Sequence, residues 1–465
     1  MMDKNVWSEA NQKKVKAIDT FAKEYREFLD NGKTERECTD LIVNEIEKAG
    51  FVELKKLIDS NKKLKAGDKV YAVNMNKAVI MFNIGKQPLE NGMNILGAHI
   101  DSPRLDLKGN PLYEDTEIAY LDTHYYGGVK KYQWVTLPLA LHGVVVKKDL
   151  TTVEINIGED EDDPVFFISD LLIHLASEQM DKKASKVIEG DQLDVIVGSM
   201  PLSQNKDAKD KEKEAVKANI LKLLKDNYDI EEDDFKSAEI EVVPAGRSRD
   251  VGFDRSLILG YGHDDRVCAF PSYKALLEAG NCEKTTCCIL VDKEEIGSVG
   301  ATGMRSRFFE NVVAEIINLC GQYSDLALRR CLANSNMLSS DVNAAYDPTF
   351  GSSFDKKNAT KLGHGIVLEK YTGARGKSGS NDANAEYLAK LRSVFEADKV
   401  IYQTGELGKV DVGGGGTIAY ILALYGMNVT DCGVPVLNMH APWECISKAD
   451  LYEAKCGYVA FLKNC

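Results

Sequence analysis

Two adjacent acids, Glu294 and Glu295, follow the apolar run Cys288 to Val291 and precede Gly297. The apolar run predicts a buried strand, and the glycine predicts a turn behind it. Ligands of open α/β sheets bind outside the carboxyl ends of the strands, so a metal ligand and a general base are expected here. Charged pairs usually face water, so if the pair is considered without the other motifs, a solvated acidic turn is the alternative to a metal ligand and a base.

A histidine stands at a second predicted strand end. His99 follows the buried strand predicted over residues 94–98, and Ser102-Pro103 closes that strand. In His99-Ile100-Asp101 the imidazole can reach a metal while Asp101 fixes the ring and its tautomer. A purely structural histidine is the alternative for this triplet in isolation.

Further ligand-type residues follow three more apolar segments. Asp264 and Asp265 come after the run 257–260, Asp341 follows a mixed apolar segment, and His440 follows the strand-like run 434–437. One of the two adjacent aspartates can bridge two metal ions, whereas Asp265 and Arg266 can equally form an ion pair without a chemical role.

Together these strand ends offer a complete set of ligands for a two-zinc site. The set supplies nitrogen and oxygen donors from five elements, namely His99, Asp264, Glu295, Asp341 and His440. Two divalent ions about 3.5–4 Å apart can activate a water and polarise a carbonyl. Glu294 then remains as a general base, which accepts the proton of the water and passes it to the leaving amine. Cobalt or manganese suits the same ligands.

The surrounding pattern predicts an α/β fold with two domains, the usual number for 465 residues. Helical spacing over 15–28 ends at Asn31-Gly32, and Thr34 with Glu37 forms a capping box for the next helix. Strand-like runs follow at 69–73, 78–84 and 94–98. Residues 106–250 are richer in β-type alternation, which predicts an inserted β-rich domain, so residues 1–105 and 251–465 together form the catalytic domain.

Charge and hydropathy exclude several classes of partner. The net charge of −14 argues against nucleic acid and against an anionic membrane surface, because both reward basic patches. The N-terminal residues lack an apolar stretch of signal-peptide length, and no run of about 18 apolar residues occurs. The eleven cysteines are scattered without Cys-x-x-Cys spacing. A cytoplasmic protein that does not enter a membrane is expected.

The ordered motifs resemble the M18 family of zinc aminopeptidases over nearly the whole chain. The motifs are His99 to Arg104, Gly262 to Arg266, Asp292 to Ser298, Ser340-Asp341 and Asn438 to Glu444. The resemblance implies a phosphorylase/peptidase-like catalytic domain with a central mixed sheet flanked by helices. It also implies that the inserted domain mediates dimers, which build a tetrahedral dodecamer that admits only short peptides.

The resemblance further implies a role for each site residue. Asp264 would bridge both zinc ions. His99 and Asp341 would complete one ion, and Glu295 and His440 the other. Glu294 would be the general base, and Asp101 would orient His99.

Four residues outside these motifs are also candidates. His174 resembles a family histidine that reaches the active site of the neighbouring subunit and stabilises the substrate oxyanion; a histidine on an amphipathic helix is the alternative. His364, Lys370 and Lys377 fall where relatives line the pocket for the first side chain. Basic residues there suit Asp or Glu, whereas the surrounding residues 371–380 resemble the vacuolar type of enzyme, which prefers neutral and apolar side chains. The side-chain preference therefore stays open.

We thus expect a homo-oligomeric aminopeptidase that removes the N-terminal residue of short peptides with a water activated by two zinc ions. Another two-metal amide hydrolase, such as a carboxypeptidase or a deacylase, is the alternative within enzymes. A non-catalytic assembly protein stabilised by its metals is the alternative from another class.

Overall fold

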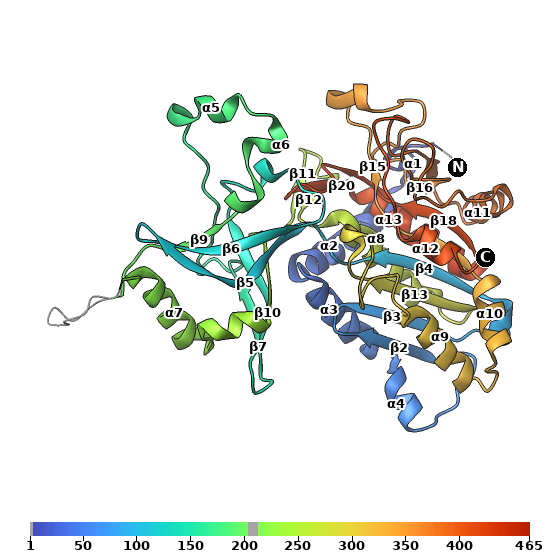
Figure 1. Ribbon diagram of the computed structural model, residues 1–465. Coiled ribbons are helices and arrows are strands. Elements are labelled where there is room, and N and C mark those ends of the chain that lie inside the picture. Colours follow the sequence, from blue (N-terminus) through green and yellow to red (C-terminus); the bar gives the residue numbers. More distant parts are fainter. Residues whose placement is uncertain (1–2, 203–212) are drawn as a thin grey trace. The chain divides into compact units, whose positions relative to one another are not determined.

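The computed structural model in Figure 1 describes residues 3–202 and 213–465. The chain divides into two compact units. Unit 1 comprises Met1–Ser102, Ser248–Met439 and Glu444–Cys465, and unit 2 comprises Pro103–Arg247 and His440–Trp443. Unit 1 is therefore discontinuous in sequence, with most of unit 2 inserted after residue 102.

Unit 1 is built on a nine-stranded mixed sheet. Its strands, in spatial order, are β1 (Val52–Glu53), β2 (Lys69–Asn74), β3 (Ala78–Asn83), β13 (Thr285–Val291), β4 (Met93–His99), β14 (Asn336–Ser339), β18 (Asn428–Gly433), β16 (Ile366–Glu369) and β17 (Tyr402–Thr404). Strands β13, β4, β14 and β18 are parallel to one another, whereas β3 and β16 run antiparallel to their neighbours in this group. The α/β class predicted from the sequence is confirmed.

Apolar side chains alternate between the two faces of this sheet. In β4, Leu96 and Ala98 join one core cluster, whereas Met93 and Ile95 join the other. This alternation follows from the two-residue period of a strand, and it lets helices cover both faces. The first cluster includes residues of α2 (Gln12–Asn31), α3 (Glu35–Lys48), α8 (His263–Ala279), α11 (Ala385–Ala397) and α13 (Lys448–Asn464). The second includes residues of α4 (Leu54–Asp59), α9 (Phe308–Leu319), α10 (Asp325–Ala333) and α12 (Ala419–Ala423).

The two N-terminal helices form as their local sequence predicts. Helix α2 ends at Asn31, and the N–H of Gly32 bonds to the carbonyl of Phe28. Helix α3 begins after Thr34, whose hydroxyl accepts from Glu37 N while the Glu37 carboxylate accepts from Thr34 N. This reciprocal pair satisfies two N–H groups that the first turn of a helix leaves without partners.

A smaller five-stranded sheet completes unit 1. Its strands, in spatial order, are β11 (Arg249–Val251), β12 (Leu257–Gly260), β20 (Glu444–Ser447), β19 (Pro435–Leu437) and β15 (Asn343–Ala344). Strand β12 leads into α8, so this sheet determines where that helix starts. The short helix α1 (Val6–Glu9) contributes Val6 to a small separate core with Ile18, Ile401 and Ala449.

Unit 2 contains a six-stranded antiparallel sheet. Its strands, in spatial order, are β8 (Thr152–Ile157), β7 (Leu139–Val146), β10 (Ala238–Pro244), β5 (Arg104–Asp115), β6 (Ile118–Tyr126) and β9 (Val195–Gly198). Helix α7 (Ala215–Tyr228) packs against β5 and β6, and the short helices α5 (Ser177–Met180) and α6 (Ala184–Val187) lie in the connection between β8 and β9. Within residues 3–202 and 213–465, no helix combines the length and the apolar character that a membrane span requires.

Strand register brings three chain segments to one edge of the large sheet. Val291 at the end of β13 pairs with His99 at the end of β4, and Ser339 at the end of β14 pairs with Gly97. Because the three strands are parallel, the residues that follow them emerge side by side.

Close packing at this edge depends on Gly433. A Cβ atom at this position would lie 1.6 Å from the main-chain oxygen of Asp341. We expect Gly433→Ala to destabilise the protein by about 1–3 kcal/mol and to displace Asp341, because one backbone must move away from the other. Thermal unfolding followed by circular dichroism measures the loss.

Gly457→Ala is the matched control. A Cβ atom at Gly457 would meet its nearest neighbour, in Ile366, at an ordinary 3.4 Å, and alanine is favoured over glycine within a helix such as α13 by about 0.5–1 kcal/mol. Its melting temperature should be unchanged or higher. An equal loss in both variants would show that the approach of Gly433 to Asp341 is not a special constraint.

Candidate active site

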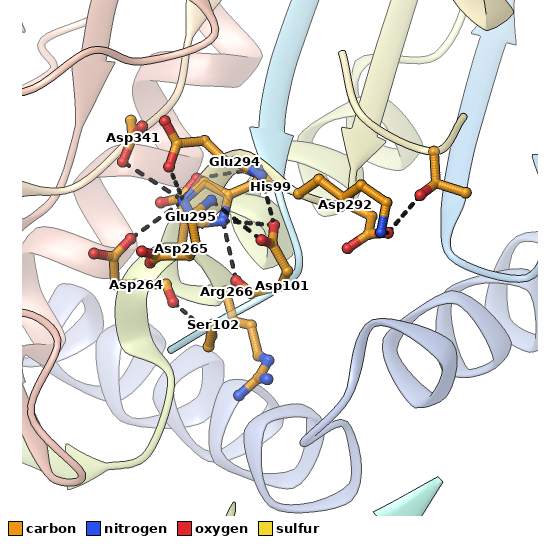
Figure 2. Close-up of polar contacts among 12 residues, drawn as sticks. His99, Asp101, Ser102, Asp264, Asp265, Arg266, Asp292, Glu294, Glu295 and Asp341 are labelled. Carbon is orange, nitrogen blue, oxygen red and sulfur yellow. Dashed lines mark hydrogen bonds and ion pairs between the residues drawn. The ribbon is translucent and has the colours of Figure 1, made fainter. Parts of the chain in front are cut away.

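Acidic side chains from three segments of unit 1 surround His99, as Figure 2 shows. Asp264 and Asp265 stand at the start of α8, where their non-helical backbone angles precede the regular helix. Glu294 and Glu295 open the 3-10 turn η6 (Glu294–Ile296) after β13. Asp341 follows β14, the neighbour of β4. The ends of β13 and β14 and the start of α8 therefore bring these acids together around His99.

The His99 ring is at the centre of the group. Its Nε2 lies 3.2 Å from Asp264 Oδ1, 3.9 Å from Glu294 Oε2 and 3.9 Å from Asp341 Oδ1. His99, Asp265 and Asp341 place possible ligand atoms within 4.8 Å of one another, and so do His99, Glu294 and Glu295. These distances allow small movements of the side chains to enclose a cation.

Burial and charge make this group unfavourable without a cation. Desolvation and the neighbouring carboxylates raise the pKa of Asp265 and of Asp341 well above the usual value. Burial alone would lower the pKa of His99, but its hydrogen bonds with Asp101 and Asp264 outweigh burial and raise it well above the usual value. Imidazole and carboxylate donors are the set that zinc accepts, and a divalent ion would offset the excess negative charge. The residues present therefore fit a metal centre.

The chain segment 99–102 connects the acids to one another. Asp101 Oδ1 and Oδ2 accept from the backbone N–H groups of Glu294 and Glu295, both at 3.2 Å. The Ser102 hydroxyl donates to the main-chain oxygen of Asp264 at 2.6 Å. Hydrogen bonds of this kind orient the side chains that act on a ligand.

The turn that carries the glutamates has an unusual backbone. Lys293, Gly297 and Ser298 all have positive φ angles of 70°, 89° and 60°. Lys293 precedes the glutamates and Gly297 and Ser298 follow them, so left-handed residues flank the turn on both sides. Glycine accommodates such an angle without steric cost, which explains Gly297 at the end of the turn.

The structure also assigns positions that the sequence left open or unnoticed. Asp265 is fully buried, and its Oδ2 accepts from His99 N at 3.4 Å, so it belongs to the site and does not form a surface ion pair. Glu444 is 1% exposed, and its Oε2 accepts from Asp264 N at 2.9 Å. Glu444 ends the last of the sequence motifs, but its type alone does not distinguish a buried acceptor from a surface acid.

His440 lies in the segment His440–Trp443, which groups with unit 2. Its Nδ1 is 2.9 Å from the main-chain oxygen of Gly128, also in unit 2. The residues on either side of the segment, Met439 and Glu444, belong to unit 1. Its assignment as a metal ligand stays a prediction.

The three residues predicted to contact substrate do not form one cluster. His364 precedes β16, and its Nδ1 lies 3.0 Å from Asp3 Oδ1. Lys370 follows the same strand, and its Nζ and that of Lys377 lie 3.8 and 3.1 Å from Asp382. His364 and Lys370 thus stand at opposite ends of β16, and only the two lysines share a partner.

His174 occupies an exposed position in unit 2. It lies in the three-residue 3-10 turn η3 (Ile173–Leu175), not on an amphipathic helix as in the alternative interpretation. Its apolar neighbours Leu172, Ile173 and Leu175 are 54%, 71% and 67% exposed. Nothing within unit 2 therefore explains this apolar segment as part of a core.

Comparisons with known proteins agree with this geometry. A family model described as "Aminopeptidase I zinc metalloprotease (M18)" matches residues 28–462. A protein of Clostridium acetobutylicum named "Probable M18 family aminopeptidase 1" is 60% identical over 461 residues, which cover 99% of this chain and 98% of that protein. A solved M18 family structure from Thermotoga maritima has a TM-score of 0.94 at 46% identity, with 100% of both chains covered.

A more distant likeness concerns the fold alone. A yeast structure described as an mApe1 dodecamer is 20% identical, has a TM-score of 0.75 and covers 95% of each chain. The full-length family match and the 60% identity, by contrast, extend over the segments that carry the site. The chain belongs to the M18 family of zinc aminopeptidases.

Proposed function

We propose that this protein removes the N-terminal residue of short peptides with a water activated by two metal ions. The observation that carries the proposal is the convergence of His99 with acids from three segments at one buried sheet edge. Acids in such numbers suit two cations better than one, because each ion needs several oxygen or nitrogen donors.

The donors divide into two sets around a shared carboxylate. Asp264 would be shared by both ions, His99 and Asp341 would complete one set, and Glu295 and His440 would complete the other. The 3.2 Å separation of His99 Nε2 from Asp264 Oδ1 and the approach of Asp341 to the same nitrogen support the first set. His440 lies just before Glu444 in the chain, and the Glu444 carboxylate accepts from Asp264 N. This nearness in sequence supports the second set. Zinc is the expected metal, with cobalt or manganese as substitutes.

Glu294 is the base of the proposed reaction. When bound, the ions supply Lewis-acid activation of the water and of the peptide carbonyl. Glu294 is adjacent in sequence to a metal ligand, and 16% of its side chain is exposed, so its carboxylate can meet both water and substrate. It accepts the proton from the water and transfers it to the amine that leaves.

Unit 2 has the properties of an assembly domain. Its segment around His174 exposes several large apolar side chains, and exposed apolar patches mark interaction surfaces. We propose that unit 2 forms dimers, that the dimers build a tetrahedral dodecamer, and that His174 enters the active site of a neighbouring subunit. The dodecamer described for the yeast relative supports this assembly.

His364, Lys370 and Lys377 remain candidates for binding the first side chain of the peptide. The shared partner Asp382 offsets part of the positive charge of the two lysines. A pocket of reduced charge would accept neutral side chains as well as acidic ones. Comparing rates for Asp, Glu, Leu and Lys amides resolves this preference.

Substitution of the two adjacent glutamates should separate their roles. Glu294→Gln should lower kcat by about 100- to 10 000-fold while the metal content stays unchanged, because it removes a base and no ligand. Glu295→Gln should instead lose metal. Elemental analysis of the purified variants, together with peptide hydrolysis rates, makes the comparison. A wild-type rate for Glu294→Gln would disprove the assignment of the base.

Blocking the amino group of the substrate tests the reaction class. A peptide should be cleaved at its first bond, whereas its N-acetylated form should react far more slowly, because an exopeptidase of this type binds the free α-amine. Product analysis by mass spectrometry shows which bond breaks. Equal rates for both forms would indicate a deacylase or another amide hydrolase, and release of the C-terminal residue would indicate a carboxypeptidase.

Removal of the metal should make stability depend on pH in a defined direction. The pKa values of Asp265 and Asp341 are raised by burial, so the metal-free folded protein retains protons that the unfolded chain releases above about pH 4. The stability from these protons is present at low pH and is lost as the pH rises. We expect the melting temperature of the chelated protein to fall as the pH rises above about 4. The melting temperature of the zinc-loaded protein should change less over the same pH range. An identical dependence of melting temperature on pH for both forms would contradict the metal assignment.

A further inference from the structure

We propose that Asp101 is a positioning residue for the catalytic base, because its carboxylate holds the backbone of the turn that carries Glu294 and Glu295. Its Oδ1 accepts from Glu294 N and its Oδ2 from Glu295 N, both at 3.2 Å, as the dashed lines in Figure 2 show. The inference rests on the proposed role of Glu294 as the base.

The main-chain oxygen and the carboxylate oxygens of Asp101 have different roles. The main-chain oxygen lies 3.0 Å from Nδ1 of His99, whereas the carboxylate Oδ1 lies 3.3 Å from the same nitrogen. The main-chain contact is shorter, and it is retained in any substitution of the side chain. The orientation of the His99 ring therefore does not depend on the carboxylate alone, and the carboxylate can serve the glutamate turn.

The turn needs an acceptor from outside. The first N–H groups of any helical turn have no partner within the turn, and η6 is only three residues long. The residue at its cap position is Lys293, whose side chain makes no capping hydrogen bond. Asp101 comes from the end of β4 and takes the place that a serine or aspartate usually fills at a helix N-terminus. The Asp101 side chain is fully buried, so water does not compete with it for these two N–H groups.

This arrangement ties the base to the histidine. Strands β4 and β13 are paired up to His99 and Val291, and Ile100 N donates to Val291 O at 2.8 Å just beyond. The Asp101 carboxylate extends the connection from the strands to the turn itself. A shift of about 1 Å in a reacting group can lower a rate about 100-fold, so a loosened turn should affect turnover more than substrate binding.

Asp101→Asn tests the inference, because it preserves size but replaces one acceptor oxygen with an N–H donor. We expect kcat to fall by about 10- to 100-fold, KM to change by less than about threefold, and zinc affinity measured by chelator competition to stay unchanged. Amide hydrogen exchange in a peptide spanning residues 292–298 should be faster in the metal-free variant than in the metal-free wild-type protein. Asp101→Ser, which introduces no N–H donor facing the turn, should behave in the same way and serves if the asparagine variant does not fold.

Asp163→Asn is the matched control. The Asp163 carboxylate also accepts from two backbone N–H groups, those of Gly158 and Asp160, but it lies in unit 2. This variant should leave kcat, KM and exchange of residues 292–298 unchanged.

A double variant separates this inference from the proposed function. In the Glu294→Gln background, Asp101→Asn should cause no further loss of kcat, because the group that it positions is already removed. Additive losses, or a loss of zinc affinity with unchanged amide exchange, would show that Asp101 acts through His99 and would overturn the inference. If Glu294→Gln kept the wild-type rate, the proposed base would be wrong, while faster exchange in Asp101→Asn would still report the structural link.

Discussion

The mutual repulsion of buried carboxylates is the constraint on which the active-site edge depends. Acids from three separate segments meet around one histidine, and burial with like charge raises the pKa of Asp265 and Asp341. Such a group persists only if the backbone holds it rigidly and its charge is reduced, either by protons or by a bound cation. The same repulsion that would destabilise the metal-free fold therefore creates a strong site for divalent ions.

The rigid support comes from backbone contacts more than from other charged side chains. Parallel strands with aligned ends set the positions, Gly433 allows β18 to approach Asp341, and Ser102 anchors the main chain of Asp264. Asp101 does the same for the glutamate turn. Because each contact uses main-chain atoms, the acids can keep their side-chain oxygens directed at the centre of the group.

The two units divide the functions of the protein. Unit 1 supplies the α/β scaffold and carries most of the proposed metal ligands and the proposed base. The fold of the whole chain follows that of an M18 family structure. Unit 2 supplies an antiparallel sheet and an exposed apolar segment around His174, which suits contact with other subunits. In the proposed function, access of substrate depends on assembly, and unit 2 also contributes His440 and His174 to the chemistry.

Local sequence determined much of this protein. Apolar runs that end in His99, Glu294 or Asp341, and the capping box at Thr34, predict elements and site residues because these signals depend only on near neighbours. Tertiary structure alone decided the burial of Asp265 and the separation of His364 from Lys370. It also decided that the Asp101 carboxylate meets a turn 193 residues away. Such contacts depend on how distant strands align in one sheet, and no short-range pattern encodes that alignment.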